Sequence, residues 1–345
     1  MNTVNYGSVE KNPQLFSFFA ENKISLGGWV VRPGLRVAKF DNNRYLLEPR
    51  LNAVLNFQNG FKLQAAWGKY LQYIVSMNTQ DIELNQFLDY YYPLEEGKAP
   101  SLSYHYMFGA EKKIDFQNSL SFDLYYKNIA RTYTFDLLHD QYEVSRFSDR
   151  IVAGQGRSYG VELMWKGSFD QFSGWASYGL SRSTRSFPHI MDGKEYDYDY
   201  DRRHSIKFVM TYQATKRISY STSFVAQSGT PRSIENSLQL FYMYDPLSGE
   251  MIYSPQYIND QKNSVRMPWS VYLDLGLRKD VVSGFGKNLA DFFRASDSYL
   301  TVNVYNALFF YRNILYYIPV SGITKMITLG DNYFPIISAG YTIKF

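Results

Sequence analysis

The sequence predicts an all-β protein, an antiparallel up-and-down β-barrel that spans a membrane with about thirteen strands. Strand-like segments with alternating apolar and polar residues recur along the whole chain, while helical periodicity is almost nowhere visible. Short turns alternate with long polar connections, and the chain ends on an aromatic residue, Phe345, that completes an alternating strand. Together these three observations favour a barrel wall over a soluble core.

Composition agrees with that class. The 345 residues include 32 Tyr and 25 Phe but no run of eighteen apolar residues, which excludes a membrane-spanning helix. In a barrel only alternate residues face lipid, so the chain stays mildly polar while aromatic residues gather at the two interfaces. The absence of cysteine excludes disulfides, a thiol nucleophile and Cys-ligated metals. A net charge of +4, with Lys and Arg scattered, argues against nucleic acid as a partner.

The strands follow one another in chain order. In the clearest of them, apolar residues share one face, which suits lipid, and the polar face suits a wet or polar-filled lumen. The clearest apolar faces are Phe61, Leu63, Ala65 and Trp67; Leu120, Phe122, Leu124 and Tyr126; and Val271, Leu273, Leu275 and Leu277. The predicted strands run over Gln14–Ile24, Trp29–Asp41, Leu46–Phe57, Phe61–Ile74, Tyr104–Ile114, Ser119–Asp136, Ser158–Gly167, Phe172–Phe187, Ser205–Ala214, Arg217–Gln227, Ser270–Val282, Tyr299–Tyr311 and Tyr333–Phe345.

The connections alternate between short and long, with exceptions at Asp41–Tyr45 and Ser283–Ser298. A transmembrane barrel needs this arrangement, with the long loops outside the cell. A propeller would repeat a signature every 40–50 residues or so, and a sandwich would not segregate loop lengths by rim. The short turns are Leu26–Gly28, Gln58–Gly60, Asp115–Asn118, Ser168–Gln171 and Thr215–Lys216; the long connections are Val75–Ser103, Leu137–Arg157, Pro188–His204, Gly229–Trp269 and Arg312–Asn332.

Several stretches, in order along the chain, resemble the barrel of TonB-dependent outer-membrane receptors, especially those of Bacteroidetes-type bacteria. They are Arg32-Pro-Gly-Leu-Arg36, Leu47-Glu-Pro-Arg-Leu51, Ser158-Tyr-Gly-Val-Glu-Leu163, Gly174-Trp-Ala-Ser-Tyr-Gly-Leu-Ser181, Tyr200-Asp-Arg-Arg-His204, Asn303-Val-Tyr-Asn306 and the closing strand.

The resemblance implies a 22-stranded barrel filled by an N-terminal plug, of which this chain would be a single barrel domain, residues 1–345, matching the C-terminal part. The start of the chain is no signal peptide. We therefore expect plug and signal peptide to be absent from the chain and its thirteen strands to form an open, incomplete sheet with a free edge on the closing strand. Tyr341, Ile343 and Phe345 would be the assembly signal in that strand.

The function that the resemblance implies is TonB-dependent active uptake of a scarce nutrient across the outer membrane of a Gram-negative bacterium. The nutrient would be a siderophore, cobalamin, a peptide or an oligosaccharide. Further implied partners are outer-membrane lipid, the barrel-assembly machinery, the TonB complex acting through the plug, and a surface lipoprotein. The alternatives are a passive porin-like or adhesive barrel and a barrel hydrolase, which would require a Ser–His pair adjacent on the wall.

The sequence predicts neither catalytic residues nor metal ligands nor a cofactor. The acidic run Glu195–Asp201 alternates carboxylates with tyrosines, which suggests a solvated rim; a calcium site would need converging oxygens. Tyr200–His204, which follows it, is expected to serve in strand-end hydrogen bonds and salt bridges. Tyrosine and arginine in the long connections are the ligand-binding candidates, because Tyr gives large contact area and Arg captures anions. They are Tyr90, Tyr91, Tyr92, Arg146, Arg150, Tyr242, Tyr244, Arg266, Tyr316 and Tyr317.

Overall fold

A computed structural model provides the fold of the chain. It describes residues 13–40, 44–76, 91–94, 98–135, 151–188, 190–233, 237–244, 251–258, 261–281, 297–308, 312–313, 330–331 and 334–344, together with 284, 286, 288 and 292.

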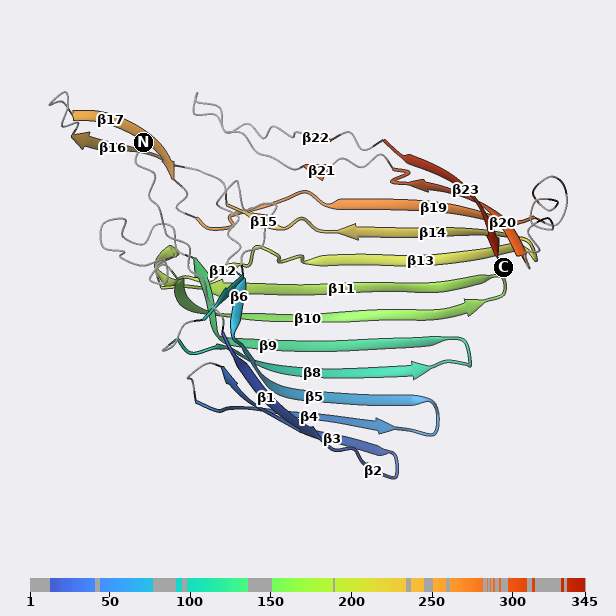
Figure 1. Ribbon diagram of the computed structural model, residues 1–345, viewed down its shortest axis with the longest axis horizontal. Coiled ribbons are helices and arrows are strands. Elements are labelled where there is room, and N and C mark those ends of the chain that lie inside the picture. Colours follow the sequence, from blue (N-terminus) through green and yellow to red (C-terminus); the bar gives the residue numbers. More distant parts are fainter. Residues whose placement is uncertain are drawn as a thin grey trace.

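Thirteen strands form one antiparallel sheet in which each strand pairs with its neighbours in the chain (Figure 1). The predicted number of strands and their order are confirmed. The strands are β1 (Leu15–Glu21), β3 (Trp29–Phe40), β4 (Leu46–Asn56), β5 (Phe61–Gln72), β8 (Ser101–Lys113), β9 (Ser119–Phe135), β10 (Ile151–Phe169), β11 (Phe172–Ser186), β13 (His204–Thr215), β14 (Ile218–Gln227), β19 (Ser270–Asp280), β20 (Asp297–Tyr305) and β23 (Ile336–Lys344).

The register keeps the predicted faces continuous from strand to strand. Directly opposed residues in an antiparallel pair lie on the same face. Leu124 of β9 is opposite Phe108 of β8 and Val161 of β10, so all three share the apolar face. The alternate residues, such as Asp123 opposite Gly109, form the polar face. We call the apolar face outward and the polar face lumenal.

One strand begins well before its predicted start. The sequence predicts Ser158 as the first residue, whereas β10 begins at Ile151. The pairing of β10 with β9 shifts register between Gly154 and Gly156, which interrupts the alternation that marks a strand. Glycine is required there because a Cβ at Gly156 would lie 2.4 Å from the carbonyl oxygen of Thr184. Because of this bulge, the first part of the strand does not continue the alternation from which the strand was predicted.

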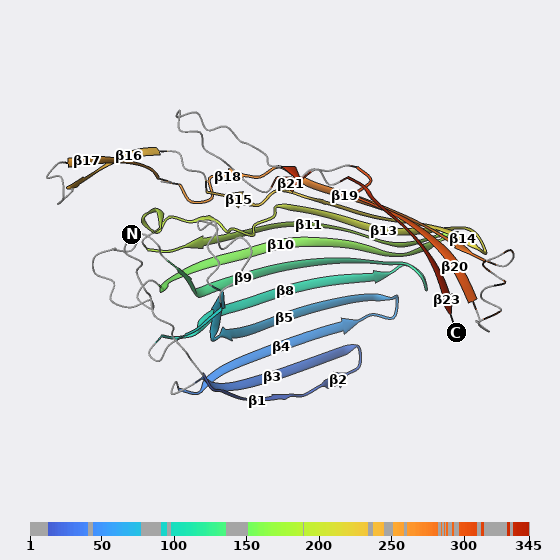
Figure 2. The same cartoon turned by 45° about the horizontal axis from the view of Figure 1, so that its top comes forward.

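The two rims of the sheet differ as predicted (Figures 1 and 2). One rim carries tight turns, such as the one in which the Asp115 carboxylate accepts hydrogen bonds from the backbone N–H groups of Gln117 and Asn118, both at 2.7 Å. The other, which we call the loop rim, carries most of the long connections. These contain short strands that the sequence did not predict: β6 (Ile74–Ser76), β7 (Tyr91–Pro93), β12 (Tyr196–Asp197), β15 (Pro231–Arg232), β16 (Ser237–Tyr244), β17 (Met251–Ile258), β18 (Val265–Arg266), β21 (Arg312–Asn313) and β22 (Gly330–Asp331), while β2 (Ile24–Leu26) lies by the first turn.

The sheet is open, as expected. In the described part of the chain, β1 pairs only with β3, and β23 pairs only with β20. Among the described residues, the clusters of buried apolar side chains are small and lie near the loop rim, one around Ala38, Phe40 and Tyr73 and one around Val75, Leu94 and Ile151. No described helix is long and apolar enough to cross a membrane. A single curved layer without a second layer to cover it needs another medium on its apolar face.

Candidate functional site

The densest polar cluster in the described residues lies on the loop rim, where β11 leads through β12 to β13. Asp201 is its centre, and its side chain is 1% exposed. The carboxylate accepts hydrogen bonds from the Ser183 backbone N–H at 2.6 Å, from Arg203 Nε at 2.9 Å and from Arg266 Nη2 at 2.6 Å. Two cations and a backbone donor thus compensate the cost of burying the charge. We call Asp197, Asp201, Arg203 and Arg266 the Asp201 cluster.

Arg266 ties two separate connections together. Its guanidinium also donates to the backbone carbonyl oxygens of Asp201 at 2.8 Å and Gly229 at 3.0 Å, and to the Asp197 carboxylate at 3.0 Å. Arg203 holds the same Asp197 carboxylate through two bonds of 2.8 and 2.9 Å from Nη2. The connection before β13 and the one before β19 are therefore joined by charge-assisted hydrogen bonds.

A second link reinforces the first. Asn263, which is buried, donates to the Asp199 carboxylate at 2.5 Å and to the backbone carbonyl oxygen of Asp197 at 2.8 Å. Its own backbone N–H donates to Ser233 Oγ at 3.2 Å. Both links support the base of the β16–β17 hairpin, whose strands lie between Ser233 and Asn263 in the chain.

The acidic run differs from its prediction in one respect. The sequence suggested solvated carboxylates along an extended chain, but Asp199 and Asp201 are 8% and 1% exposed. The reason is that the chain turns after β12, with the Asp201 N–H donating to the Tyr198 carbonyl oxygen at 2.7 Å, and brings the carboxylates under Arg203 and Arg266. The prediction that Tyr200–His204 serves in salt bridges and strand-end hydrogen bonds is confirmed. In the described part of the chain, no group of three or more metal-ligating side chains converges.

Glu195 forms an outer ion pair beside this cluster. Arg157 donates to its carboxylate at 2.8 and 2.5 Å in a two-pronged arrangement, and the Thr184 hydroxyl also donates to it. The hydrogen bond from Arg157 lowers the pKa of Glu195 below its ordinary value. Since the charged form is the one that is bound, this pair helps to hold the chain before β12 only while Glu195 is ionised.

Acidification should loosen this part of the rim. Because the folded-state pKa is depressed, the stabilisation by Glu195 is complete above its unfolded pKa, about 4.5, and is lost as pH falls through the lower folded value. We expect amide-exchange protection at Tyr196 and Asp197, corrected for intrinsic rates, to fall in that acidic range. Glu195→Gln should show lower protection at neutral pH and a flatter pH profile. The interpretation fails if the wild type and Glu195→Gln give parallel profiles.

A second charged cluster lies on the lumenal face of the wall. Glu48, 1% exposed, pairs with Arg36 and Arg50, both at 3.3 Å. The Arg50 guanidinium lies over the Tyr70 ring, 4.7 Å from its centroid, and Tyr70 stacks on His105 at 4.3 Å. Two of these residues fall in the motif Leu47-Glu-Pro-Arg-Leu51, but sequence reasoning did not identify them as charged partners across strands.

One Ser–His pair does lie on the wall. Ser103 Oγ and His105 Nε2 are 3.1 Å apart. A hydrolytic pair also needs an acid or amide that orients the imidazole. Among the described contacts of His105 there is no such group; its other neighbours are the Tyr70 ring and the cation Lys127. The arrangement therefore lacks the third member that would make it catalytic.

The predicted ligand contacts fall into three groups. Tyr91 is 67% exposed on β7, whereas Tyr92 packs against the cluster around Val75. Tyr242 and Tyr244 lie in β16, opposite Tyr253 and Met251. Arg266 lies in the Asp201 cluster; whether it also contacts a ligand stays a prediction. Tyr90, Arg146, Arg150, Tyr316 and Tyr317 lie outside the described residues.

The predicted assembly signal is described only in part. Tyr341 is opposite Leu300 of β20, and its hydroxyl donates to the Gly286 carbonyl oxygen at 2.5 Å. Ile343 is opposite Ser298. Phe345 lies outside the described residues. Recognition of these positions by the assembly machinery stays a prediction.

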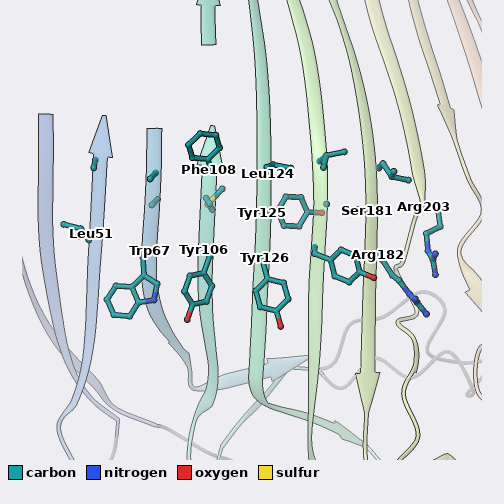
Figure 3. Close-up of a pocket in the computed structure, with 18 residues that line it drawn as sticks. Leu51, Trp67, Tyr106, Phe108, Leu124, Tyr125, Tyr126, Ser181, Arg182 and Arg203 are labelled. Carbon is teal, nitrogen blue, oxygen red and sulfur yellow. The ribbon is translucent and has the colours of Figure 1, made fainter. Parts of the chain in front are cut away.

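A hollow borders this polar cluster at Arg203 and extends away from it along the sheet. It has a volume of about 880 Å³ and lies over β4, β5 and β8–β11 (Figure 3). Most of its lining is apolar or aromatic and belongs to the outward face, including Leu51, Trp67 and Phe108. A hollow on that face is poorly suited to a polar nutrient, so we place the candidate nutrient site on the loop rim.

Comparisons with known proteins agree with this architecture. The family described as TonB dependent receptor-like, beta-barrel matches residues 2–307. No curated protein matches the sequence. Among solved structures, a ferric enterobactin receptor (PfeA) mutant from Pseudomonas aeruginosa is similar at 14% identity and a TM-score of 0.57, over 95% of this chain and 44% of that one.

Two further structures are similar to the same extent. The pyoverdine outer membrane receptor FpvA from Pseudomonas aeruginosa matches at 12% identity and a TM-score of 0.57, over 95% of this chain and 42% of that one. The ferric citrate transporter FecA matches at 13% identity and a TM-score of 0.55, over 95% of this chain and 44% of that one. The chain thus spans less than half the length of these structures, and likeness at this identity shows the fold alone.

Proposed function

Because the chain belongs to the family of TonB-dependent receptor-like β-barrels, we propose that it supplies barrel wall and extracellular ligand-contacting loops to a receptor for TonB-dependent uptake of a scarce nutrient. The observation that carries the proposal is the Asp201 cluster, which joins two long connections of the loop rim. A rim held in place by buried ion pairs presents its exposed aromatic residues in a fixed geometry, which lowers the entropic cost of ligand binding.

Family membership confirms two expectations from the sequence. The family consists of outer-membrane proteins of Gram-negative bacteria, and its members are transporters and not enzymes. The loop rim is accordingly the extracellular rim and the short-turn rim the periplasmic one. The resemblance to receptors of Bacteroidetes-type bacteria stays a prediction.

The plug and the remaining strands of such a receptor enter as part of the proposal. In the part of the chain that the structure describes, the outer edges of β1 and β23 carry unpaired backbone groups, each of which would cost several kcal/mol in lipid. We propose that, in the complete receptor, the chain is one portion of a 22-stranded barrel and that further strands pair with both edges. A plug would fill the lumen and connect the receptor to TonB, and a surface lipoprotein would be a further partner.

Energy dependence separates this function from a passive porin-like barrel. Uptake by the complete receptor should stop when TonB is deleted or when the proton gradient of the inner membrane is dissipated. A porin would continue to transport under both conditions. The ligand is proposed as a siderophore, cobalamin, a peptide or an oligosaccharide, and growth of a deletion strain on defined iron, peptide and glycan sources would distinguish these.

Exposed tyrosines on the rim should contribute to ligand affinity. Tyr91→Ala removes a ring that is 67% exposed and so should not disturb the fold. We expect the Kd of the complete receptor to rise about fivefold to thirtyfold, the effect of losing roughly 1–2 kcal/mol of aromatic contact. Tyr91→Phe keeps the ring, and Tyr45→Ala removes a tyrosine that is 69% exposed outside the predicted contacts. The prediction is wrong if the Tyr91→Ala and Tyr45→Ala receptors bind the ligand with equal affinity and alanines at 241–244 also leave the affinity unchanged. These tyrosines would then not contact the ligand.

A further inference from the structure

The hollow on the outward face is built from two adjacent rows of side chains that cross six strands (Figure 3). In each row the residues are direct partners from strand to strand, so both rows face the same side of the sheet. The row nearer the periplasm is Ala53, Ala65, Phe108, Leu124, Val161 and Leu180. The row nearer the extracellular rim is Leu51, Trp67, Tyr106, Tyr126, Tyr159 and Arg182.

The depth of the hollow comes from its small residues. Ala53 and Ala65 are opposite each other on β4 and β5, whereas Trp67 and Phe108 stand beside them. Twelve of its eighteen lining residues belong to these two outward rows. Five more form the row between them, on the lumenal face, and no other lumenal row contributes, so the hollow opens on the outward side; they are Ala66, Met107, Tyr125, Gly160 and Ser181. Its surroundings are apolar, so its occupant must carry hydrocarbon.

The aromatic row marks the extracellular interface of the membrane. Trp67, Tyr106, Tyr126 and Tyr159 are 36–48% exposed, as expected for an aromatic girdle. On β10, Phe169 lies on the same face roughly ten positions farther on; at about 3.3 Å per residue and a tilt of about 40°, this spans about 25 Å, the height of an outer-membrane apolar band. The hollow therefore opens to the outer leaflet.

Cations stand at and above the aromatic row. Arg182 ends that row and is 45% exposed; within the described ranges its one ion-pair partner is Asp197, at 3.3 Å. The next outward row toward the rim contains Lys69, Tyr104, Asn128 and Arg157 as consecutive partners. Among the described residues, Lys69 has no ion-pair partner, whereas Arg157 is held by Glu195. Positive charge thus borders the apolar hollow on its extracellular side.

We propose that this surface binds a phosphorylated, multiply acylated lipid of the outer leaflet. Acyl chains would occupy the hollow over Ala53 and Ala65, and tyrosine hydroxyls would lie at the headgroup level. Arg182 and Lys69 would bind phosphate, because an apolar hollow bordered by cations is complementary to an anionic amphiphile. The proposal does not depend on the uptake function proposed above, although the hollow borders the Asp201 cluster at Arg203 and Arg182 pairs with Asp197.

Lipid retention by the complete receptor tests the proposal. Receptor extracted in mild detergent would be examined by native mass spectrometry for bound phosphorylated glycolipid, and then delipidated and titrated with that glycolipid in phosphatidylcholine nanodiscs. We expect a saturable site, a loss of affinity of about tenfold or more for Lys69→Gln combined with Arg182→Gln, and a similar loss when Ala65→Phe fills the hollow.

Matched controls separate a site from general contact with the bilayer. Lys279→Gln removes an outward cation near the periplasmic rim, and Ala176→Phe enlarges an outward alanine outside the hollow; both should retain the lipid. The heat-modifiable fraction of each variant on gels shows whether it has folded. The proposal is overturned if the four variants bind the glycolipid equally, if the wild type does not prefer it to phosphatidylcholine, or if inorganic phosphate alone displaces it completely.

Discussion

Asp201→Ala should open the extracellular rim. The change leaves Arg203 and Arg266 without their common buried partner and removes the acceptor of the Ser183 N–H. Removing one member of a buried pair costs about 3–5 kcal/mol. Both arginines are about a third exposed and can regain water, so the cost should lie at the low end of this range. We expect the free energy of local opening to fall by about 3 kcal/mol.

Hydrogen exchange in the complete receptor measures that opening. A loss of about 3 kcal/mol corresponds to a protection factor that is roughly a hundredfold lower. Since Arg266 joins the two connections, we expect this decrease both at residues 196–203 and at residues 263–267. Asp280→Asn is the matched control, because its pair with Arg278 is exposed at the periplasmic rim and worth at most about 1 kcal/mol. Loosening of one connection without the other would show that the Asp201 cluster does not couple them.

Leu163→Arg should obstruct insertion into the membrane. Leu163 lies on the outward face in the middle of β10, opposite Phe122 and Tyr178, and is 45% exposed. Arginine near the bilayer midplane costs a barrel about 2–4 kcal/mol. We expect a clear drop in the yield of folded receptor in the outer membrane, measured as the heat-modifiable fraction on gels.

The neighbouring residue provides the control. Met164 has the opposite orientation, opposite Ser121 and Ser177 on the lumenal face, and is 36% exposed. Met164→Arg places the same charge one position along the strand, where a polar lumen can solvate it, and should leave the yield near that of the wild type. If both variants fold equally well, the assignment of the two faces is wrong.

The fold could be predicted from the sequence because each strand carries its signal locally. Alternation in stretches such as Leu120–Tyr126 specifies the two faces, and the turn residues at Gln58–Gly60 and Asp115–Asn118 specify the pairing order. The signal fails where a bulge breaks the period of two, as at Gly154–Gly156. The short strands in the long connections also escaped prediction, because two-residue pairs such as β15–β18 depend on tertiary contacts.

The candidate site could be predicted only in part. The motif Tyr200–His204 indicated salt bridges, but the sequence does not show that Arg266, 65 residues from Asp201, provides one of them. The same holds for Asn263 and Asp199, which are 64 residues apart. Alternating acidic residues in a sequence predict a solvated segment, because the turn that buries Asp199 and Asp201 cannot be predicted from them. Likewise, the outward hollow depends on the register of six strands, although Ala53 and Ala65 are visible as small residues.

The central claim is that this sheet is a wall with one face toward lipid and the other toward the lumen. Because the chain has no cysteine, single cysteines can be introduced along β10 and spin-labelled in the complete receptor. Gly160 is left out, since a Cβ there would lie 2.7 Å from the Leu180 carbonyl oxygen. The labels would be probed with oxygen, which concentrates in lipid, and with a water-soluble nickel chelate.

We expect the accessibilities of these labels to alternate with a period of two residues. Labels at Tyr159, Val161, Leu163 and Trp165 should collide preferentially with oxygen, and labels at Ser158, Glu162 and Met164 should be oxygen-poor. This alternation follows from the register of β10 with β9 and β11. Uniform accessibility along the strand, or a pattern with the two faces exchanged, would show that the apolar face of the sheet is not the one toward lipid.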